Sequence, residues 1–225
     1  MSDPIKIKTK TKSEETRERI MQAALQQFHD RGFETTTMRD IASKSGLATG
    51  AAYYYFESKD SIVLAFYDQA RKVMGPRLEE ALAETRDLRE RIKRLIQVKL
   101  EYFEPSRDLL RALSGHTNPD YALSPFSKET REIRENDIHF FKRALEESRS
   151  PGPEDLSDYL PRLLWMYQMG IILFWINDSS KKQSKTQALL DESLDVVIRL
   201  IRLSTLPLTR PIRKKVIQLM DIVMA

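Results

Sequence analysis

Hydroxyl groups, small side chains and tyrosines recur at short intervals between residues 35 and 59, where the sequence reads TTTMRDIASKSGLATGAAYYYFESK. Thr37 and Asp40, three residues apart, have the spacing of a capping box, which predicts the start of a short helix. Gly46 can adopt the left-handed conformation that ends such a helix, and a second helix is expected to begin at Ala48. Two short helices joined by a tight turn make a helix-turn-helix.

The second helix of this motif carries side chains suited to reading DNA. A helix fits the major groove, where hydroxyl and methyl groups can contact base edges and donors can contact phosphates. Gly50, Ala51 and Ala52 form a thin surface, and Thr49 and the following tyrosines supply polar groups. The alternative is a plain structural corner, and we expect Phe56 and one tyrosine to pack in the core.

A set of residues in this stretch also follows the pattern of a known family. The set is Thr37, Ile41, Ala42, Ser45, Gly46, Leu47, Ala48, Gly50, Tyr53, Tyr55, Phe56, Ser58 and Lys59. On these residues the segment resembles the DNA-binding motif of the TetR/AcrR family of bacterial transcriptional regulators. Ala48 departs from the usual Ser or Thr, so the second helix lacks a capping hydroxyl unless Thr49 supplies it. Tyr55 stands where His is commoner.

The resemblance implies DNA contacts at particular positions. Phosphate contacts are implied for Thr37, Tyr54 and Lys59. A base contact is implied for Arg39, and base or phosphate contacts for Thr49, Ala51 and Tyr53. Gly50 would let the backbone of the second helix approach the duplex closely.

Enzyme chemistry has little support in the sequence. His29, His116 and His139 are the only histidines, cysteine is absent, and no Glu-x-x-His or His-Glu-x-x-His pair occurs. The sequence also has no glycine-rich phosphate loop. We therefore expect no catalytic residue, no metal and no cofactor.

Charge alone does not indicate a DNA-binding protein. The 225 residues carry a formal net charge of +4, with 41% hydrophobic and 31% charged residues, an ordinary globular composition. Residues 1–12 have four lysines against one acid, and residues 207–225 have four basic residues against one acid, so the remainder is slightly acidic. The N-terminal segment is expected to be a solvated tail or an arm that strengthens DNA binding.

We expect a cytoplasmic protein with no membrane partner. The most apolar run, residues 163–176, is shorter than the roughly 20 residues that span a bilayer. The start of the chain lacks the apolar core of a signal peptide.

The elements that position the motif are all predicted to be helices, because glycine is scarce and no alternating strand pattern stands between turn signals. Ser13 is expected to begin the first helix and Ser58 to cap a fourth, and Gly75 with Pro76 is expected to separate an N-terminal head from a body. The expected domains are a basic flexible arm at 1–12, a helix-turn-helix head with a linking helix at 13–75, a ligand-binding and dimerisation body at 76–206, and an extra C-terminal helix at 207–225.

The body is expected to contain long amphipathic helices. One is predicted at 77–103, another from Ser124, and two more at about 156–176 and 186–204, of which the first is apolar nearly all round. A helix without a polar face needs a partner, so we expect these last two to form a homodimer interface, as the resemblance also implies. Its expected residues are Leu173, Phe174, Leu190, Leu194, Val197 and Ile201.

The resemblance further implies an apolar pocket in the body that binds a small-molecule effector. The expected lining is Tyr102, Phe103, His116, Phe126, Phe140, Phe141, Trp165, Tyr167 and Gln168. His139 is a further candidate for a polar contact. A bulky apolar or aromatic effector suits this lining better than a sugar or a metal.

Together these features predict a homodimeric repressor, released from a palindromic double-stranded operator by its effector. Repression is implied by the resemblance alone. Two alternatives remain open: a helical ligand-binding or interaction module without sequence-specific DNA binding, and a transcriptional activator of the same fold.

Overall fold

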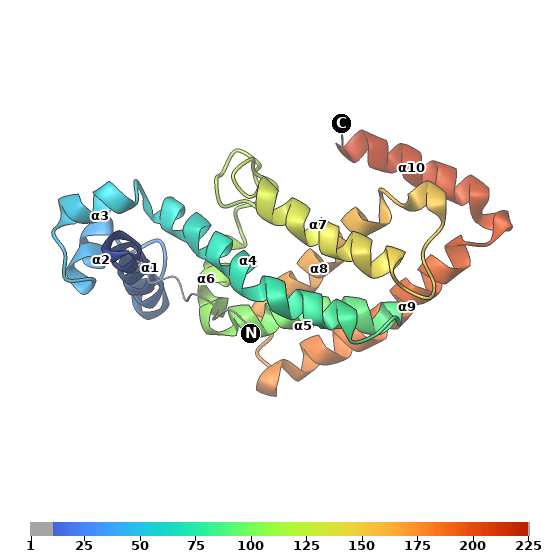
Figure 1. Cartoon of the computed structure of the whole chain (residues 1–225), viewed down its shortest axis with the longest axis horizontal. Helices are drawn as coiled ribbons and strands as arrows, with labels where there is room; N and C mark the ends of the chain where they lie inside the picture. The colour runs from blue at the N-terminus through green and yellow to red at the C-terminus, as the bar shows by residue number, and fades with distance from the viewer. Residues whose placement is uncertain (1–10, 225) are drawn as a thin grey trace, which may run out of the picture. The chain divides into compact units, whose positions relative to one another are not determined.

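The computed structural model describes the backbone of residues 11–224 and the side chains of residues 11–222 (Figure 1). Every regular element in this range is a helix, which confirms the predicted all-α fold. Most of the predicted basic arm, residues 1–10, lies outside the described residues. No helix in the described range is both long enough and apolar enough to cross a membrane.

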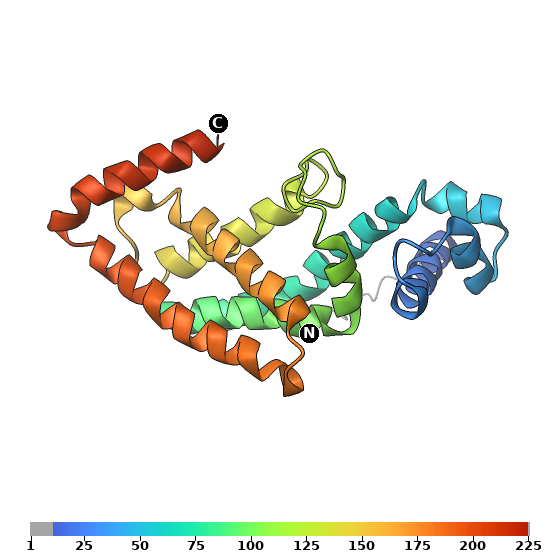
Figure 2. The same cartoon turned by 180° about the vertical axis from the view of Figure 1, so that it is seen from behind.

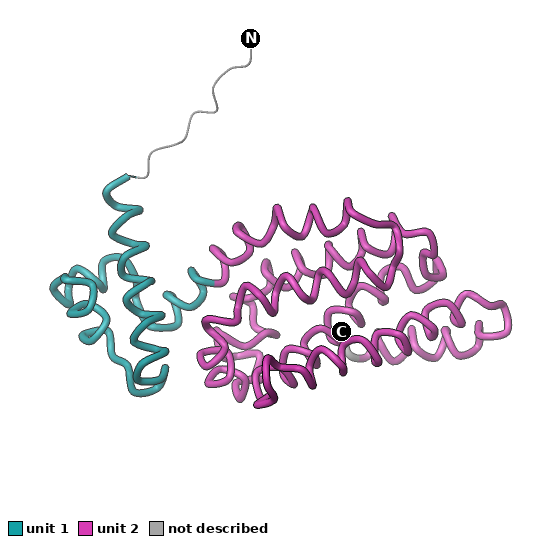
Figure 3. The backbone as a smooth tube through the Cα atoms, turned by 90° about the horizontal axis from the view of Figure 1, so that it is seen from below, with its two compact units in different colours: residues 1–66 teal, residues 67–225 magenta. Residues whose placement is uncertain are grey.

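The chain divides into two compact units, which meet between Phe66 and Tyr67 (Figure 3). This boundary falls inside helix α4 (Lys59–Ala83), before the expected division at residues 75 and 76. The expected break at Gly75 and Pro76 is wrong, because the helix continues through both residues. Pro76 is exposed, and so is Lys72, whose carbonyl loses its usual helical donor and can turn to water instead.

Unit 1 contains α1 (Lys12–Arg31), α2 (Met38–Lys44), α3 (Thr49–Tyr55) and the first part of α4. Thr11 begins α1 through a reciprocal capping box with Glu14, slightly before the predicted start at Ser13. Helix α1 packs on α2, and α2 packs on α3. The buried side chains of this small core include Ile20, Ala24, Phe28, Phe33, Ile41, Ala52, Phe56 and Ile62.

Unit 2 is a helical bundle around one continuous apolar core (Figure 2). Besides the remainder of α4, its helices are α5 (Leu88–Phe103), α6 (Arg107–Leu113), α7 (Arg131–Glu146), α8 (Leu160–Asn177), α9 (Ser184–Ser204) and α10 (Arg210–Met224). Short 3₁₀ turns lie at Glu104–Ser106, Glu154–Leu156, Lys181–Gln183 and Pro207–Thr209. Helix α8 packs against α6, α7 and α9, and α5 packs against α7 and α9.

The helix predicted at 77–103 is instead two helices, α4 and α5. Asp87 caps α5 by accepting a hydrogen bond from the Glu90 amide. The buried guanidinium of Arg91 then donates to the Leu82 carbonyl (2.9 Å) and the Thr85 carbonyl (2.6 Å). These bonds satisfy carbonyls at the end of α4 that would otherwise lack donors, so the turn is stable where the apolar pattern alone predicted continuity.

The helix predicted from Ser124 begins later, at Arg131. Hydroxyl groups explain the difference, because they hydrogen-bond to nearby carbonyls and favour turns over helix. Ser127 donates to the Ala122 carbonyl (2.8 Å), and Thr130 donates to the Ser124 carbonyl (2.7 Å).

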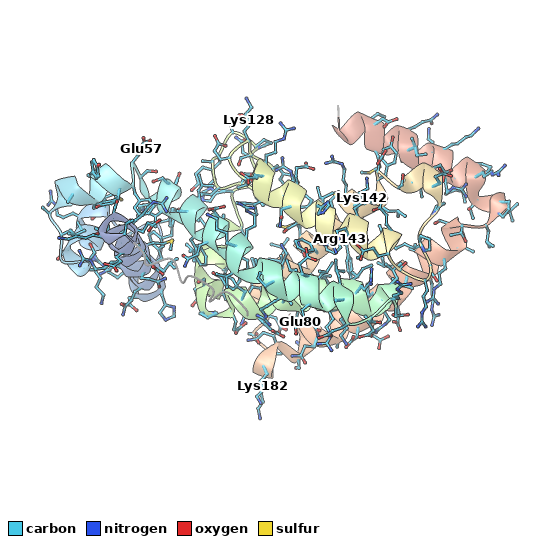
Figure 4. All side chains as sticks on the ribbon, viewed as in Figure 1. Glu57, Glu80, Lys128, Lys142, Arg143 and Lys182 are labelled. Carbon is cyan, nitrogen blue, oxygen red and sulfur yellow. The ribbon has the colours of Figure 1, made fainter. Side chains whose placement is uncertain are left out.

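On α7, an ion-pair network ties the helix to its neighbour. The Arg143 side chain (Figure 4) contacts Glu79 of α4 at 2.7 Å and Glu147 at 2.9 Å. Because these groups are largely exposed, we assign them a modest contribution to stability.

Candidate functional site

The predicted turn between α2 and α3 is present in unit 1. The Thr37 hydroxyl accepts from the Asp40 amide, and the Asp40 carboxylate accepts from the Thr37 amide, so the capping box is complete. Gly46 has a φ of 69°, in the left-handed region, and the Leu47 amide closes the turn on the Ala42 carbonyl (2.9 Å). The helix-turn-helix prediction is therefore confirmed as a fold.

The capping box also restricts what Thr37 can offer a phosphate. Its hydroxyl hydrogen is donated to Asp40 (2.6 Å), and its amide is donated to the same carboxylate (2.9 Å). Hydrogen bonds from Thr37, with help from the nearby guanidinium of Arg31, lower the pKa of Asp40. In this arrangement Thr37 stabilises α2, and a phosphate contact would require its hydroxyl to exchange partners.

Helix α3 begins at Thr49 without a side-chain cap, so Thr49 does not replace the hydroxyl that Ala48 lacks. Ala52 and Phe56 are buried, whereas Tyr54 is 84% exposed and Tyr53 is half exposed. The expectation that Phe56 packs in the core is correct.

Gly50 lies on the exposed side of α3. A Cβ atom built on Gly50 would have no neighbour within 4 Å. Its φ is not in the left-handed region that favours glycine. A glycine in a helix interior costs roughly 1 kcal/mol relative to alanine, and Gly50, as the second residue of α3, costs part of this. Neither the packing nor the backbone of unit 1 explains this choice.

Three basic residues in and after the helix-turn-helix differ in their contacts. Arg39 and Lys44 on α2 are exposed and have no ion pair among the described residues. Lys59 is different, because its ammonium group donates to the Phe33 carbonyl (2.6 Å) and the Glu34 carbonyl (3.3 Å) and lies 4.6 Å from the Phe33 ring centroid. Lys59 therefore anchors the start of α4, a role that the sequence did not reveal.

The overall charge of unit 1 is close to neutral. Residues 1–66 contain ten basic and nine acidic residues, a formal charge of +1. The acidic residues include exposed Glu57, labelled in Figure 4. A DNA contact by these residues must therefore depend on where individual side chains lie.

Unit 2 contains a cavity of about 140 Å³ within its bundle. Its lining is mainly apolar and comes from helices α4 to α8 and from the segment between α6 and α7. The lining residues used below are Leu78, Lys99, Asp137, Trp165, Gln168 and Ile172. Of the predicted lining residues, Phe103, Trp165 and Gln168 face this cavity.

The other predicted lining residues lie elsewhere, and the prediction is corrected for each. Phe140 and Phe141 are buried in the bundle core, and the Tyr167 hydroxyl pairs with Ser193 of α9 (2.8 Å). Three more, Tyr102, His116 and Phe126, contact aromatic neighbours instead: Phe103, Tyr121 and Trp165 respectively. Sequence spacing could not separate these positions, because aromatic residues occur on several faces of the helices.

One end of the cavity is polar. Lys99 on α5 and Asp137 on α7 form an ion pair, and the Gln168 amide nitrogen lies 3.4 Å from the same carboxylate. All three residues are buried. Lys99 and Asp137 were missed, although each interrupts an otherwise apolar stripe at helical spacing, which is the signal that could have found them.

A buried hydroxyl also lines the cavity. Burial raises the pKa of Tyr67 well above its ordinary value. Among the described residues, no group of three His, Cys, Asp or Glu side chains is arranged to hold a metal ion.

The predicted dimer residues lie on two different faces of unit 2. Leu173 and Phe174 of α8 are exposed, but Leu190, Leu194 and Ile201 of α9 are buried in the core of the unit, and Val197 packs against that core. The prediction is wrong for these α9 residues. Both faces of α9 are apolar at helical spacing, so the sequence did not indicate which one faces inward. The outward residues are Leu189, Val196, Leu200 and Leu203.

A helix-turn-helix in one unit and a helical bundle with a cavity in the other are the two parts expected of a ligand-responsive helical regulator. Residues 20–66 match the family model described as bacterial regulatory proteins, tetR family, and residues 91–216 match the tetracyclin repressor-like C-terminal domain. The second model covers more than half of the chain. The chain therefore belongs to the tetR family, as the resemblance predicted, and this is a family of regulators and not of enzymes.

The individual relatives have low sequence identity to this chain. The uncharacterised HTH-type regulator YdgC of Bacillus subtilis is 28% identical over 115 residues, covering 49% of this chain and 58% of YdgC. The chain thus aligns with less than two thirds of that relative. A TetR regulator from Nitrosomonas europaea has a TM-score of 0.62 at 19% identity, over 81% of this chain and 97% of that structure. FadR of Bacillus subtilis, in complex with stearoyl-CoA, has a TM-score of 0.61 at 17% identity. The match covers 80% of this chain and 96% of that structure. These two structures share the fold.

Proposed function

We propose that the protein is a homodimeric repressor that binds a palindromic operator through α3 and is released when a small, largely apolar effector occupies the cavity of unit 2. The proposed site of action is the cytoplasm, where bacterial DNA lies. The observation that carries the DNA-binding part is Gly50, a helix-destabilising residue whose exposed position the chain's own packing does not require. Close approach of the α3 backbone to a duplex would explain why glycine stands at this position.

The rest of the exposed face of α3 agrees with such a contact. Tyr53 and Tyr54 project into solvent beside Gly50, and the unpaired charge of Arg39 lies on the preceding helix. Tyrosine hydroxyls and arginine side chains donate to phosphates, and arginine also reads guanine in the major groove. Thr49 and Ala51, both half-buried, would contribute at the edge of this surface.

The regulatory part of the proposal relies on the cavity. An effector that fits only one of two conformations shifts the population toward that conformation, and DNA affinity then changes by the effector's differential affinity for the two. The apolar lining supports an apolar effector, and the FadR structure with stearoyl-CoA shows that a protein of this fold has been found with an acyl ligand.

The proposed dimer surface combines the outward faces of α8 and α9. Met166, Leu173 and Phe174 are exposed on α8, and Leu189, Val196, Leu200 and Leu203 form a stripe along α9. Exposed apolar groups at helical spacing on two adjacent helices suit a second copy of the same chain, because a twofold interface uses one surface twice. Val196→Lys should dissociate the dimer in sedimentation equilibrium, whereas Arg202→Glu, on an exposed position outside the stripe, should not.

The decisive experiment is selection of binding sites from random duplex DNA by the purified dimer at near-physiological salt. Enrichment of a palindrome with half-sites about one helical turn or more apart is expected. If the folded dimer enriches nothing, the sequence-specific DNA-binding proposal fails and the chain is a ligand-binding module. A reporter placed behind the selected site then separates repression from activation.

A further inference from the structure

Gln168 stands at the polar end of the cavity and is 1% exposed. Its amide nitrogen faces the Asp137 carboxylate, which already accepts from Lys99. This orientation of the amide is the favourable one, since the reversed amide would direct an oxygen at a carboxylate.

With the amide nitrogen directed at Asp137, the amide oxygen of Gln168 needs a donor of its own. The Gln168 Oε1 atom is buried and has no hydrogen-bond donor among the described residues. Buried polar atoms are normally paired, so an orphaned acceptor on the wall of a cavity indicates a donor that comes from outside the chain.

A second orphaned atom on the lining, Arg71 Nε, is a weaker indication. The Arg71 guanidinium already pairs with Asp68 at 2.8 Å and Glu132 at 3.3 Å, and its side chain is 27% exposed. Bulk water reaches this group directly, whereas Gln168 meets only what enters the cavity.

The charges around Gln168 restrict the donor further. Lys99 and Asp137 compensate each other, and the guanidinium of Arg134, also on the lining, donates to the Pro125 and Ser127 carbonyls. At Gln168 an anionic ligand would therefore face the Asp137 carboxylate, and a cationic ligand would face the Lys99 ammonium. A group that donates one hydrogen bond without carrying charge suits this end of the cavity best. Hydroxyl and amide N–H groups have that property.

We propose that the effector is an uncharged, compact apolar molecule with a hydroxyl or amide N–H that donates to Gln168 Oε1, and that Gln168 selects for this donor. The inference rests on the proposed function of the cavity as the effector site. Leu78, Trp165 and Ile172 hold the apolar part of the molecule. The cavity of about 140 Å³ is close in size to an apolar cavity of about 150 Å³ that admits benzene, so one ring fills it.

Three probes of this size test the donor. Cyclohexanol can donate a hydrogen bond, methoxycyclohexane can only accept one, and cyclohexanecarboxylate carries a negative charge. The two tryptophans of the chain, Trp165 and Trp175, both line the cavity, so intrinsic fluorescence of the full-length protein reports binding directly. We expect cyclohexanol to bind about tenfold more tightly than methoxycyclohexane, the effect of one added neutral hydrogen bond. We expect the carboxylate to bind most weakly.

Gln168→Met removes the acceptor and keeps a side chain of similar length. The preference for cyclohexanol should fall to about twofold or less, while methoxycyclohexane affinity stays unchanged. Ile172→Val, four residues further along α8, is the matched control, and it should weaken both neutral probes equally. The thermal midpoint of Gln168→Met should stay close to that of the wild type, because the variant removes an orphaned acceptor together with one long hydrogen bond to Asp137, which keeps its ion pair with Lys99.

Equal binding of the two neutral probes by the wild type would overturn the inference, and so would tightest binding of the carboxylate or no binding of any probe. These readouts use no DNA. A protein that selects a palindrome but ignores the hydroxyl loses only this inference. A protein that prefers the hydroxyl but selects no DNA loses the proposed repressor function.

Discussion

The exposed face of α3 and the cavity of unit 2 differ in how the chain departs from its own best packing. At Gly50 the chain accepts a weaker helix although a Cβ would meet nothing within 4 Å. At Gln168 it keeps a buried acceptor that has no donor within the described part of the chain. One departure is at the surface and concerns the backbone, and the other is internal and concerns a hydrogen bond. Both are positions that the fold alone does not explain, which is where functional residues are expected.

The largest expected effect tests whether the charges of Lys99 and Asp137 stabilise each other at the polar end of the cavity. Lys99→Met leaves the buried Asp137 carboxylate without its cation, so we expect a loss of about 3–5 kcal/mol in the free energy of unfolding. Urea denaturation followed by tryptophan fluorescence measures this, since both tryptophans lie in unit 2.

The double variant Lys99→Met/Asp137→Leu is the control. It removes both charges and should recover most of the lost stability, because no buried charge remains unpaired. If the single and double variants were equally unstable, the ion pair would not be the reason for the loss, and Gln168 would not face compensated charges.

The next prediction compares Arg39, whose charge faces solvent, with Lys59, whose ammonium group donates to carbonyls of the chain. Arg39→Ala should weaken specific DNA binding by about 1–3 kcal/mol and leave stability unchanged, because Arg39 is exposed and has no ion pair among the residues described. Lys59→Ala should destabilise unit 1 by about 1–3 kcal/mol, because its ammonium holds two carbonyls. Fluorescence anisotropy of labelled operator and hydrogen exchange of α1–α3 amides measure the two effects.

An Lys59→Ala protein with normal exchange but lost DNA binding would reverse this assignment. It would restore Lys59 as a phosphate contact, as the family resemblance implies.

A smaller and opposite pair of effects is expected at Gly50. Gly50→Ala should stabilise unit 1 by up to about 1 kcal/mol, because alanine is the better helix former and its Cβ meets no atom. The same methyl group should weaken operator binding about tenfold, roughly 1.4 kcal/mol, by holding the α3 backbone away from DNA. Ala51→Gly is the control, since it weakens the helix without adding a group. Unchanged affinity in Gly50→Ala would remove the main support for α3 as the DNA-reading helix.

The sequence predicted local features with strong chemical signatures more reliably than it predicted faces and boundaries. The capping box at Thr37 and the left-handed Gly46 were correct because a few neighbouring residues determine them. The continuity of α4 through Pro76 was missed, since packing on both sides of the proline stabilises a helix that local rules would end.

The prediction of the cavity from the sequence was limited in the same way. Trp165 and Gln168 were predicted, but the partner charges Lys99 and Asp137 come from different helices and meet only in the folded bundle. On α9 two apolar stripes compete, and the choice between Leu194 inside and Val196 outside depends on the packing of α5 and α8. Spacing indicates that a face is apolar but not what will cover it.

The smallest expected effect compares how the two units respond to acid. In unit 2, burial alone would raise the pKa of Asp178, but hydrogen bonds from Ser180 and Thr186 outweigh it and lower the pKa. In unit 1, the Thr37 hydrogen bonds lower the pKa of Asp40. A lowered folded-state pKa stabilises above the ordinary value of 3.8, and this stability is lost as the pH falls through the folded value. Both units should therefore weaken below about pH 4, and not between pH 5 and 8.

Asp178→Asn should flatten the acid dependence of unit 2, read by tryptophan fluorescence, and leave that of α2 unchanged, read by hydrogen exchange. Asp40→Asn should do the reverse, because each carboxylate caps a helix of its own unit: Asp178 accepts from the Thr186 amide near the start of α9, and Asp40 completes the cap of α2. If either variant changed the acid response of both units, the two would unfold together. The stability effects at Gly50 and Lys99 would then have to be treated as properties of one cooperative molecule.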